Sequence, residues 1–256
     1  MAHRTTHSLR HEYELYVERE IEDYKESVPR SVILSIGDEA VASLRAQEQM
    51  ALDEMVLWDE VDRIIKLRLR IPTYQTWRRR RLKMLSRYRM PEHWGLQPDE
   101  PLLPAIQPRH ESHVLVAGNV EGTALYLAAN GCDVTALEPA ADVVDRVLAA
   151  ADAAGLTTRV RGCVGDLGHF HPDGPLQAVV CCATAFDGLS IGERARVIEL
   201  LKGVTTDGGV HLVEPLIVGE TSVSIDELRS RYEGWDVSIE QDRSASPSFL
   251  AKKTMA

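Results

Sequence analysis

The sequence contains no apolar run that approaches the roughly 18 residues of a membrane-spanning helix. Its first residues, MAHRTTHSLRHE, lack the apolar core of a secretory signal peptide. The four cysteines form no CxxC pair and have no spacing typical of a disulfide framework. We therefore expect a cytoplasmic protein whose thiols are reduced.

Acidic residues are missing from one segment that is otherwise densely charged. No Asp or Glu lies between Arg63 and Glu92, whereas 11 Lys and Arg lie between Arg63 and Arg89. The whole chain has 29 basic and 39 acidic residues, so the remainder carries 18 basic against 39 acidic residues. A strongly acidic body thus carries one basic arm. The net charge of −10 argues against nucleic acid as the main partner.

Residues 1–95 have the apolar spacing of helices. Apolar side chains recur every three or four residues over 9–28, which predicts a first helix that ends near a proline. Ser35 is a candidate N-cap for a second helix, which we expect to run to Arg70. A third helix is predicted over residues 73–89, where the cations are densest. We interpret residues 1–95 as a helical, basic arm.

The densest cations of this arm are Arg78, Arg79, Arg80, Arg81 and Lys83. Three interpretations are open. They can form a solvated face that pairs with the acidic domain, or they can bind nucleic acid, which the charge elsewhere disfavours. They can also dock the protein onto a protein partner or an anionic phospholipid surface, where each cation adds about 1 kcal/mol. We favour docking over the solvated face. The aromatic residues beside the cations, Tyr74, Trp77 and Tyr88, suit a membrane interface and also suit a core.

The second half of the chain has a different pattern. Residues 96–112 hold four prolines and are predicted to be a linker without helix or strand. Strands are predicted at 113–117, 132–137, 158–162, 176–183, 209–214, 235–240 and 247–252, with helices near 122–130, 140–154, 190–203 and 224–232. This alternation over residues 113–256 predicts an α/β, Rossmann-like fold with a mostly parallel sheet of seven strands. The last two strands lack a helix between them, so we expect an antiparallel strand at the edge.

Four residues follow the strands at the positions where such sheets bind ligands. Gly118 permits a sharp exit from the first strand, and Gly122 opens a helix whose free N–H groups attract polar or anionic groups. Glu138 lies 20 residues after Gly118, where a carboxylate can accept hydrogen bonds from ribose hydroxyls. Asp166, in the turn after the third strand, can bind an adenine amino group. Together they suit an adenosine-containing ligand.

Simpler interpretations of these residues stay open. Glu138 can cap the next helix, and Asp166 can simply form a turn. Asp166, His169 and His171 suggest a metal site, but no Cys or Glu completes a ligand set, so we predict no metal. Cysteines at the end of a buried strand are ordinarily core thiols.

The chain resembles the class I S-adenosylmethionine-dependent methyltransferases, in particular the small tellurite-resistance-type members. The resemblance covers about residues 112–253. Its matching segments are VLVAG, GTALYLAANGCDVTALEP, RVRGCVGDL, TDGGVHLVEP, DELRSRYEGWDV and FLAKK. Of these, ALYLAANGCDVTA and ELRSRYEGW are the most specific.

The resemblance implies a role for each of the residues at the strand ends. Gly118 and Gly122 would line the methionine and ribose of S-adenosylmethionine, Glu138 would hold the ribose, and Asp166 would hold the adenine. Cys182, which begins a segment ending at residue 187, would face the methyl group.

Three positions depart from the family's pattern. Val116 stands where the family has an acid that helps to hold the methionine amine, and Val120 stands where it has a glycine. A β-branched residue hinders both the backbone approach and the unusual φ of that glycine. Gln177 replaces an acid that often precedes the fourth strand. A lost ionic contact and an added clash would each weaken cofactor binding by about 1–3 kcal/mol.

Two functions are therefore open. One is a methyltransferase-fold protein with weakened or lost catalysis, an accessory subunit docked through its basic arm, for example at the cytoplasmic face of a membrane complex. The other is an active methyltransferase on a small molecule. A missing catalytic base does not oppose the second, because the sulfonium is already reactive and the protein mainly positions the reactants. The departures at Val116 and Val120 favour the first.

Overall fold

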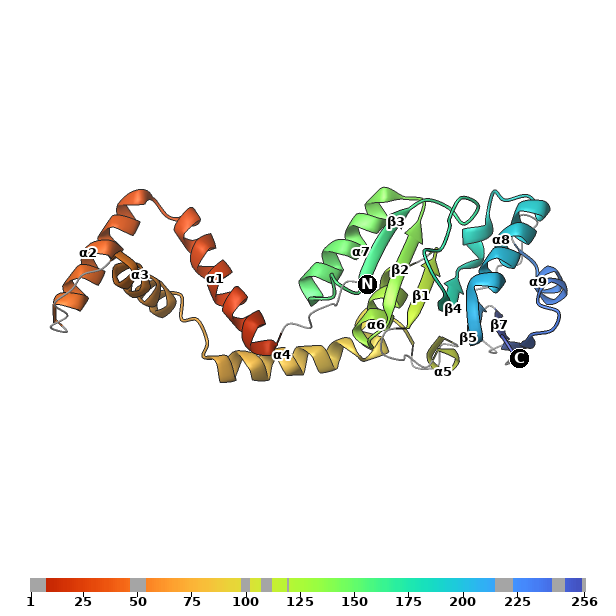
Figure 1. The fold of residues 1–256 in the computed structure, drawn as a ribbon, viewed down its shortest axis with the longest axis horizontal. Coiled ribbons are helices and arrows are strands. Elements are labelled where there is room, and N and C mark those ends of the chain that lie inside the picture. The colour runs from red at the N-terminus through yellow and green to blue at the C-terminus, as the bar shows by residue number, and fades with distance from the viewer. Residues whose placement is uncertain are drawn as a thin grey trace. The chain divides into compact units, whose positions relative to one another are not determined.

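The computed structural model describes residues 8–46, 54–97, 102–106, 112–118, 120–214, 223–240 and 247–254 (Figure 1). The chain divides into two compact units, Met1–Met84 and Leu85–Ala256. The sequence placed the end of the helical arm at residue 95, so residues 85–95 lie in the sheet unit instead. The side chains of Tyr88, Trp94 and Leu96 pack against the core of that unit, which accounts for the difference.

The first unit is helical. It contains α1 (Leu9–Ser27), α2 (Arg30–Ala46), α3 (Glu54–Arg68) and the beginning of α4 (Tyr74–Tyr88). The predicted first and third helices are confirmed. The single helix predicted from Ser35 to Arg70 is wrong, because Ser35 lies inside α2 and α2 packs against α3.

This hairpin explains the apolar pattern of the segment. A single helix with two apolar rows would need cover on both sides. Packing α2, α3 and α1 together buries part of those rows in one core, whereas Met55 and Trp58 of α3 stay exposed. The core side chains are Val17, Ile21, Ile36, Ala40, Val61, Ile64 and Ile65.

The second unit contains a seven-stranded sheet. Its elements are η1 (Pro91–Trp94), α5 (Leu102–Ala105), β1 (His113–Ala117), α6 (Glu121–Ala129), β2 (Asp133–Glu138), α7 (Ala141–Ala154), β3 (Val160–Val164), β4 (Leu176–Cys181), η2 (Ala183–Phe186), α8 (Ile191–Val204), β5 (Thr205–Val213), α9 (Ile225–Arg231), β6 (Asp236–Glu240) and β7 (Ser248–Lys252). The predicted strand and helix positions in this half are confirmed within a few residues. Part of the predicted linker is helical, since α5 buries Leu102 against the sheet unit's core.

The sheet has the strand order β3-β2-β1-β4-β5-β7-β6. Neighbours from β3 to β5 are parallel, and β7 runs antiparallel to both β5 and β6. The predicted mostly parallel, Rossmann-like sheet is confirmed; its antiparallel strand stands one place inside the edge. The strand order reverses between β1 and β4, which is where doubly wound sheets bind ligands.

Two apolar layers cover the sheet. Alternate residues of β1 face opposite sides, as the period of two in a strand requires. Val114 and Val116 face the core formed with α6 and α7, whereas Leu115 and Ala117 face the core formed with α8 and α9. Both faces are thus buried, and the carboxyl edge of the strands is where polar side chains gather.

Candidate functional site

The turn after β1 is shaped by Gly118. Its φ of +69° lies in the left-handed region that favours glycine. A Cβ atom on Gly118 would lie 3.2 Å from Cβ of Cys182 and 3.3 Å from Cβ of Ala185. The turn after β1 therefore lies directly against the segment that follows β4, at the switch point of the sheet.

The start of α6 is covered by the end of η1. A Cβ atom on Gly122 would lie 2.5 Å from the carbonyl oxygen of Trp94, closer than real Cβ atoms approach. The Trp94 indole donates a hydrogen bond of 2.7 Å to the Tyr88 carbonyl, and Gly95 ends η1 with a φ of +79°. Because Gly122 has no Cβ atom, the backbone carbonyl of Trp94 can pack against it.

The two departures from the family's pattern are core residues. Val116 and Val120 are 1% and 0% exposed, and both belong to the apolar cluster between the sheet and α6. Val120 precedes α6 with φ −79° and ψ −20°, an ordinary right-handed conformation. The strain expected from a β-branched residue at this position is therefore not found. Neither side chain offers a charge to an amine.

Glu138 ends β2 with a carboxylate oxygen that has no protein partner. Its Oε2 is buried and accepts no hydrogen bond among the described residues. The backbone carbonyl of Glu138, by contrast, has a partner, since it accepts a hydrogen bond of 3.0 Å from the Gly165 amide. A buried acceptor without a partner costs about 1–3 kcal/mol. A hydroxyl-bearing ligand would remove that cost, so this end of the site fits a ribose.

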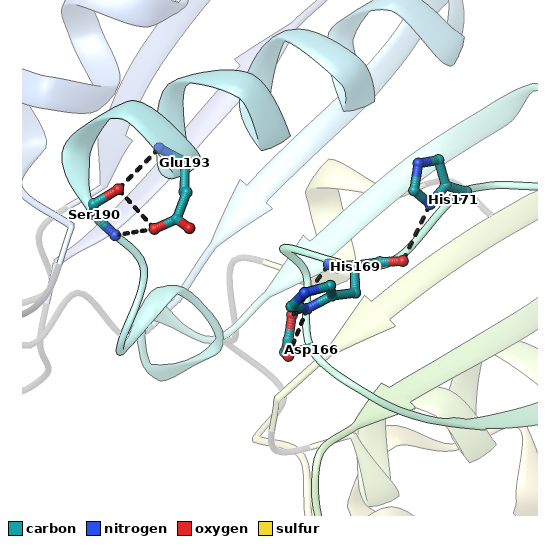
Figure 2. Close-up of polar contacts among 5 residues, drawn as sticks. All are labelled: Asp166, His169, His171, Ser190 and Glu193. Atoms are coloured by element: carbon teal, nitrogen blue, oxygen red, sulfur yellow. Dashed lines mark hydrogen bonds and ion pairs between the residues drawn. The ribbon is translucent and has the colours of Figure 1, made fainter.

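Asp166 follows β3 and pairs with His169 (Figure 2). Its carboxylate oxygens lie 2.9 and 3.1 Å from His169 Nδ1, and one accepts the His169 amide at 3.1 Å. The hydrogen bond from the His169 side chain is the main reason that the pKa of Asp166 is lowered. The Asp166 side chain is 47% exposed and retains room to accept a further donor.

The other side chains drawn in Figure 2 make local contacts. His171 Nδ1 lies 3.1 Å from the His169 carbonyl oxygen and turns away from Asp166. Glu193 and Ser190 form a reciprocal capping box at the start of α8, which lowers the pKa of Glu193. Within the described ranges, no group of three or more His, Cys, Asp or Glu side chains is arranged to hold a metal ion.

The thiols beside the switch point are buried. Burial raises the pKa of Cys181 to about 12, so this side chain is a core thiol. The Cys182 sulfur accepts a hydrogen bond of 3.1 Å from the Thr184 hydroxyl, and its amide donates to the Ala117 carbonyl. Cys182 therefore lies beside Gly118, and its side chain is only 9% exposed, less than a reactive thiol requires. That it would face a methyl group stays a prediction.

The basic run of the helical arm lies on α4 and its members differ in environment. Arg78, Arg79, Arg80 and Lys83 are exposed. The Arg81 side chain is only 16% exposed, and its Nε lies 3.3 Å from a carboxylate oxygen of Glu12 on α1. Arg81 thus belongs to the packing of the first unit, and its neighbours form an outward cationic surface. Among the described residues, no helix is long and apolar enough to cross a membrane.

Trp94 is the residue that sequence reasoning missed at this site. The signal was available in the short stretch Pro91–Gly95, where a proline and a glycine bracket an aromatic residue as they would in a turn. Because the cations next to it suggested a helical arm, this turn was assigned to the wrong unit.

No protein-family model and no curated protein matches the chain in sequence. Solved structures similar to it are class I methyltransferases. TehB from Haemophilus influenzae is similar over 60% of this chain and 61% of that chain, with 16% identity and a TM-score of 0.48. N-methyltransferase NodS from Bradyrhizobium japonicum WM9 is similar over 70% of this chain and 96% of that chain, with 11% identity and a TM-score of 0.45.

A third similar structure is the magnesium protoporphyrin IX methyltransferase ChlM from Synechocystis PCC 6803, solved with bound SAM. It is similar over 57% of this chain and 71% of that chain, with 15% identity and a TM-score of 0.45. The chain spans about three fifths of the length of the TehB structure. All three TM-scores are below 0.5, and the fold assignment rests on the strand order and register described above.

Proposed function

We propose that this protein is an accessory subunit with a methyltransferase fold. Its sheet unit binds an adenosine-containing ligand through the ribose but does not hold the methionine end of S-adenosylmethionine. The protein docks to an acidic partner through the exposed cations of α4. The observation that carries the proposal is the contrast between the unpartnered carboxylate oxygen of Glu138 and the fully buried, apolar Val116 and Val120.

Support for ribose binding comes from Glu138. Its buried oxygen lacks a protein donor, and the residue lies at the carboxyl edge of the sheet beside β1. Two ribose hydroxyls could donate to this carboxylate. Asp166 lies at the end of the neighbouring strand and would take the adenine amino group.

Support for a lost methionine end comes from the start of α6. No charge is available at Val116, and the Cα of Gly122 faces the Trp94 carbonyl. The backbone that would approach the ligand at Val120 is instead the ordinary first turn of a helix. Because methyl transfer requires the methyl group to be held in line with its acceptor, a site that holds only the nucleoside would be a poor catalyst.

The alternative is an active methyltransferase that acts on a small molecule. The left-handed turn at Gly118 and the free oxygen of Glu138 favour it, because both suit the nucleoside part of the methyl donor. The chemistry that the donor supplies when bound is its reactive sulfonium methyl group.

Isothermal titration with S-adenosylmethionine separates the two functions. We expect binding weaker than micromolar for the accessory subunit, and micromolar binding would contradict it. Glu138→Gln should weaken whatever binding remains by about 10- to 100-fold, because a hydrogen bond to a charged group contributes about 1.5–3 kcal/mol. Glu233→Gln removes an exposed carboxylate of the same unit and serves as the matched control.

A further inference from the structure

Charge is segregated along the helical arm. Residues 9–62 contain 15 acidic and 5 basic residues, whereas residues 63–89 contain 11 basic residues and no acidic one. Residues 9–89 therefore have an acidic part and a basic part of nearly equal and opposite charge, and the basic part runs past Met84, where the first unit ends. Such a distribution is typical of surfaces that meet an oppositely charged surface.

The acidic part presents a row of glutamates along the outside of α1. Glu14, Glu18, Glu22 and Glu26 are four residues apart and all are exposed. Arg10 pairs with the first at 3.0 Å and Lys25 with the third at 2.8 Å. Glu18 and Glu26 have no ion pair among the described residues, although Arg19 is also exposed on this helix.

The basic part presents a matching row along α4. Arg79, Lys83 and Arg87 are also four residues apart and exposed, with Arg80 beside them. Arg79 and Arg87 have no ion pair among the described residues. Like charges at this spacing destabilise a helix by about 0.2–0.5 kcal/mol for each pair. The members of these rows that have no ion pair among the described residues, Glu18 and Glu26 on α1 and Arg79 and Arg87 on α4, are those that a complementary surface would meet.

The two rows face away from one another within a copy. The inner faces of α1 and α4 meet through Tyr13, Tyr16 and Trp77, with ring centroids 5.5 and 6.1 Å apart. The Glu12–Arg81 pair lies on the same inner faces. At 100° per residue, each charged row lies roughly opposite these contacts on its own helix. The rows cannot neutralise each other within one molecule.

We propose that copies of this chain associate head to tail, with the glutamate row of α1 in one copy against the cationic row of α4 in the next. Both rows repeat every four residues, about 6 Å along the helix, so their charges come into register. Each helix also exposes a leucine, Leu15 on α1 and Leu82 on α4. The contact joins two different surfaces, so it continues from copy to copy unless it closes into a ring.

A second copy is favoured over the other anionic partners by the glutamate row. A phospholipid surface or a nucleic acid would engage only α4 and would repel the exposed glutamates of α1. A second copy satisfies both rows. This inference rests on the docking part of the proposed function and is independent of its ribose-binding part.

Two charge-reversal variants test the proposal. Arg79→Glu with Arg87→Glu removes the basic row, and Glu18→Lys with Glu26→Lys removes the acidic row. Sedimentation velocity of the wild type should show association that grows with protein concentration and disappears near 0.5 M salt, an order-of-magnitude threshold set by screening (~4 Å Debye length). Each variant alone should associate at least about tenfold more weakly. Mixed together, they should form a complex, because the intact glutamate row of the first variant meets the intact cationic row of the second, and the two reversed rows are also complementary.

Three outcomes would overturn the proposal. The wild type could remain monomeric at low salt and high concentration, or the two variants could fail to form a complex although circular dichroism shows both folded. Alternatively, vesicles containing phosphatidylserine could bind the wild type and the variant with Glu18→Lys and Glu26→Lys, but not the variant with Arg79→Glu and Arg87→Glu, while the mixture of the two variants forms no complex. That last result would assign α4 to an anionic lipid surface. The titrations of adenosine-containing ligands would be unaffected in each case.

Discussion

The carbonyl oxygen of Trp94 lies 2.5 Å from the position that a Cβ atom on Gly122 would take. This contact joins the turn of η1 to the first turn of α6. A glycine that resembles part of a cofactor-binding motif thus has a structural reason to be glycine without any ligand. The same motif residue can therefore persist in a protein that no longer holds the methionine end of the cofactor.

Gly122→Ala should destabilise the protein by about 1–3 kcal/mol, because the added methyl group would clash with backbone that cannot move freely. Gly203→Ala is the matched control, since Gly203 lies in α8 with nothing within 4 Å of an added Cβ. That control should leave stability unchanged or raise it by up to about 1 kcal/mol. Urea unfolding of both variants measures the difference, and equal midpoints would contradict the contact.

Glu138→Gln should leave the melting temperature unchanged or raise it, while it weakens adenosine binding. The reason is that Oε2 of Glu138 is buried without a donor, so the folded protein gains nothing from its charge. Sites kept for ligands commonly cost stability in this way. Differential scanning calorimetry without ligand gives the measurement. A large drop in melting temperature would show that Glu138 is a structural residue.

The sequence predicted the sheet because its apolar strands and helices alternate with clear turn signals. It also placed Glu138 at the end of the second strand and Asp166 in the turn after the third, because the apolar patterns of those strands stop there. It could not predict the hairpin of α2 and α3, since two apolar rows on one segment fit a long helix or a folded one equally well. The contact of Trp94 with Gly122 could not be predicted either, because the apolar periodicity of two segments does not show that they pack against each other.

Because of His211, the free energy of unfolding should decrease as the pH falls. It is buried between the Thr205 hydroxyl at 2.7 Å and the Tyr232 hydroxyl at 2.6 Å. Thr205 donates to the Leu201 carbonyl, so it accepts from His211 Nε2–H, and Tyr232 donates to Nδ1. Both ring nitrogens are thus satisfied by the neutral form. Burial, followed by the charges of nearby lysines, lowers the pKa of His211 from 6.5 to about 3.

The direction of this pH dependence follows from the difference in proton binding between the folded and unfolded chains. Below pH 6.5 the unfolded chain takes up a proton that folded His211 refuses, so stability is lost as the pH falls from 6.5 towards 3. The loss is about 1.4 kcal/mol per pH unit, or about 2 kcal/mol between pH 6.5 and 5. Urea unfolding at several pH values measures the slope. His211→Gln should flatten it, and an unchanged slope in that variant would contradict the assignment.

Arg81 should differ from Arg79 in its effect on the helical unit. Arg81→Gln removes the half-buried pair with Glu12 and should lower stability by about 1 kcal/mol. Arg79→Gln removes an exposed charge and should change stability by less than about 0.5 kcal/mol. Thermal melts followed by circular dichroism compare the two. If Arg79→Gln were the more damaging variant, the division between packing and docking cations would be wrong.

We propose that the site holds a nucleoside and does not hold the amino-acid end of the cofactor. Isothermal titration of the wild-type protein with adenosine and with S-adenosylhomocysteine tests it most directly, because the two ligands differ only by that end. We expect dissociation constants within about threefold of each other, a difference of less than about 0.7 kcal/mol. S-adenosylhomocysteine binding more than about 30-fold tighter than adenosine would contradict it.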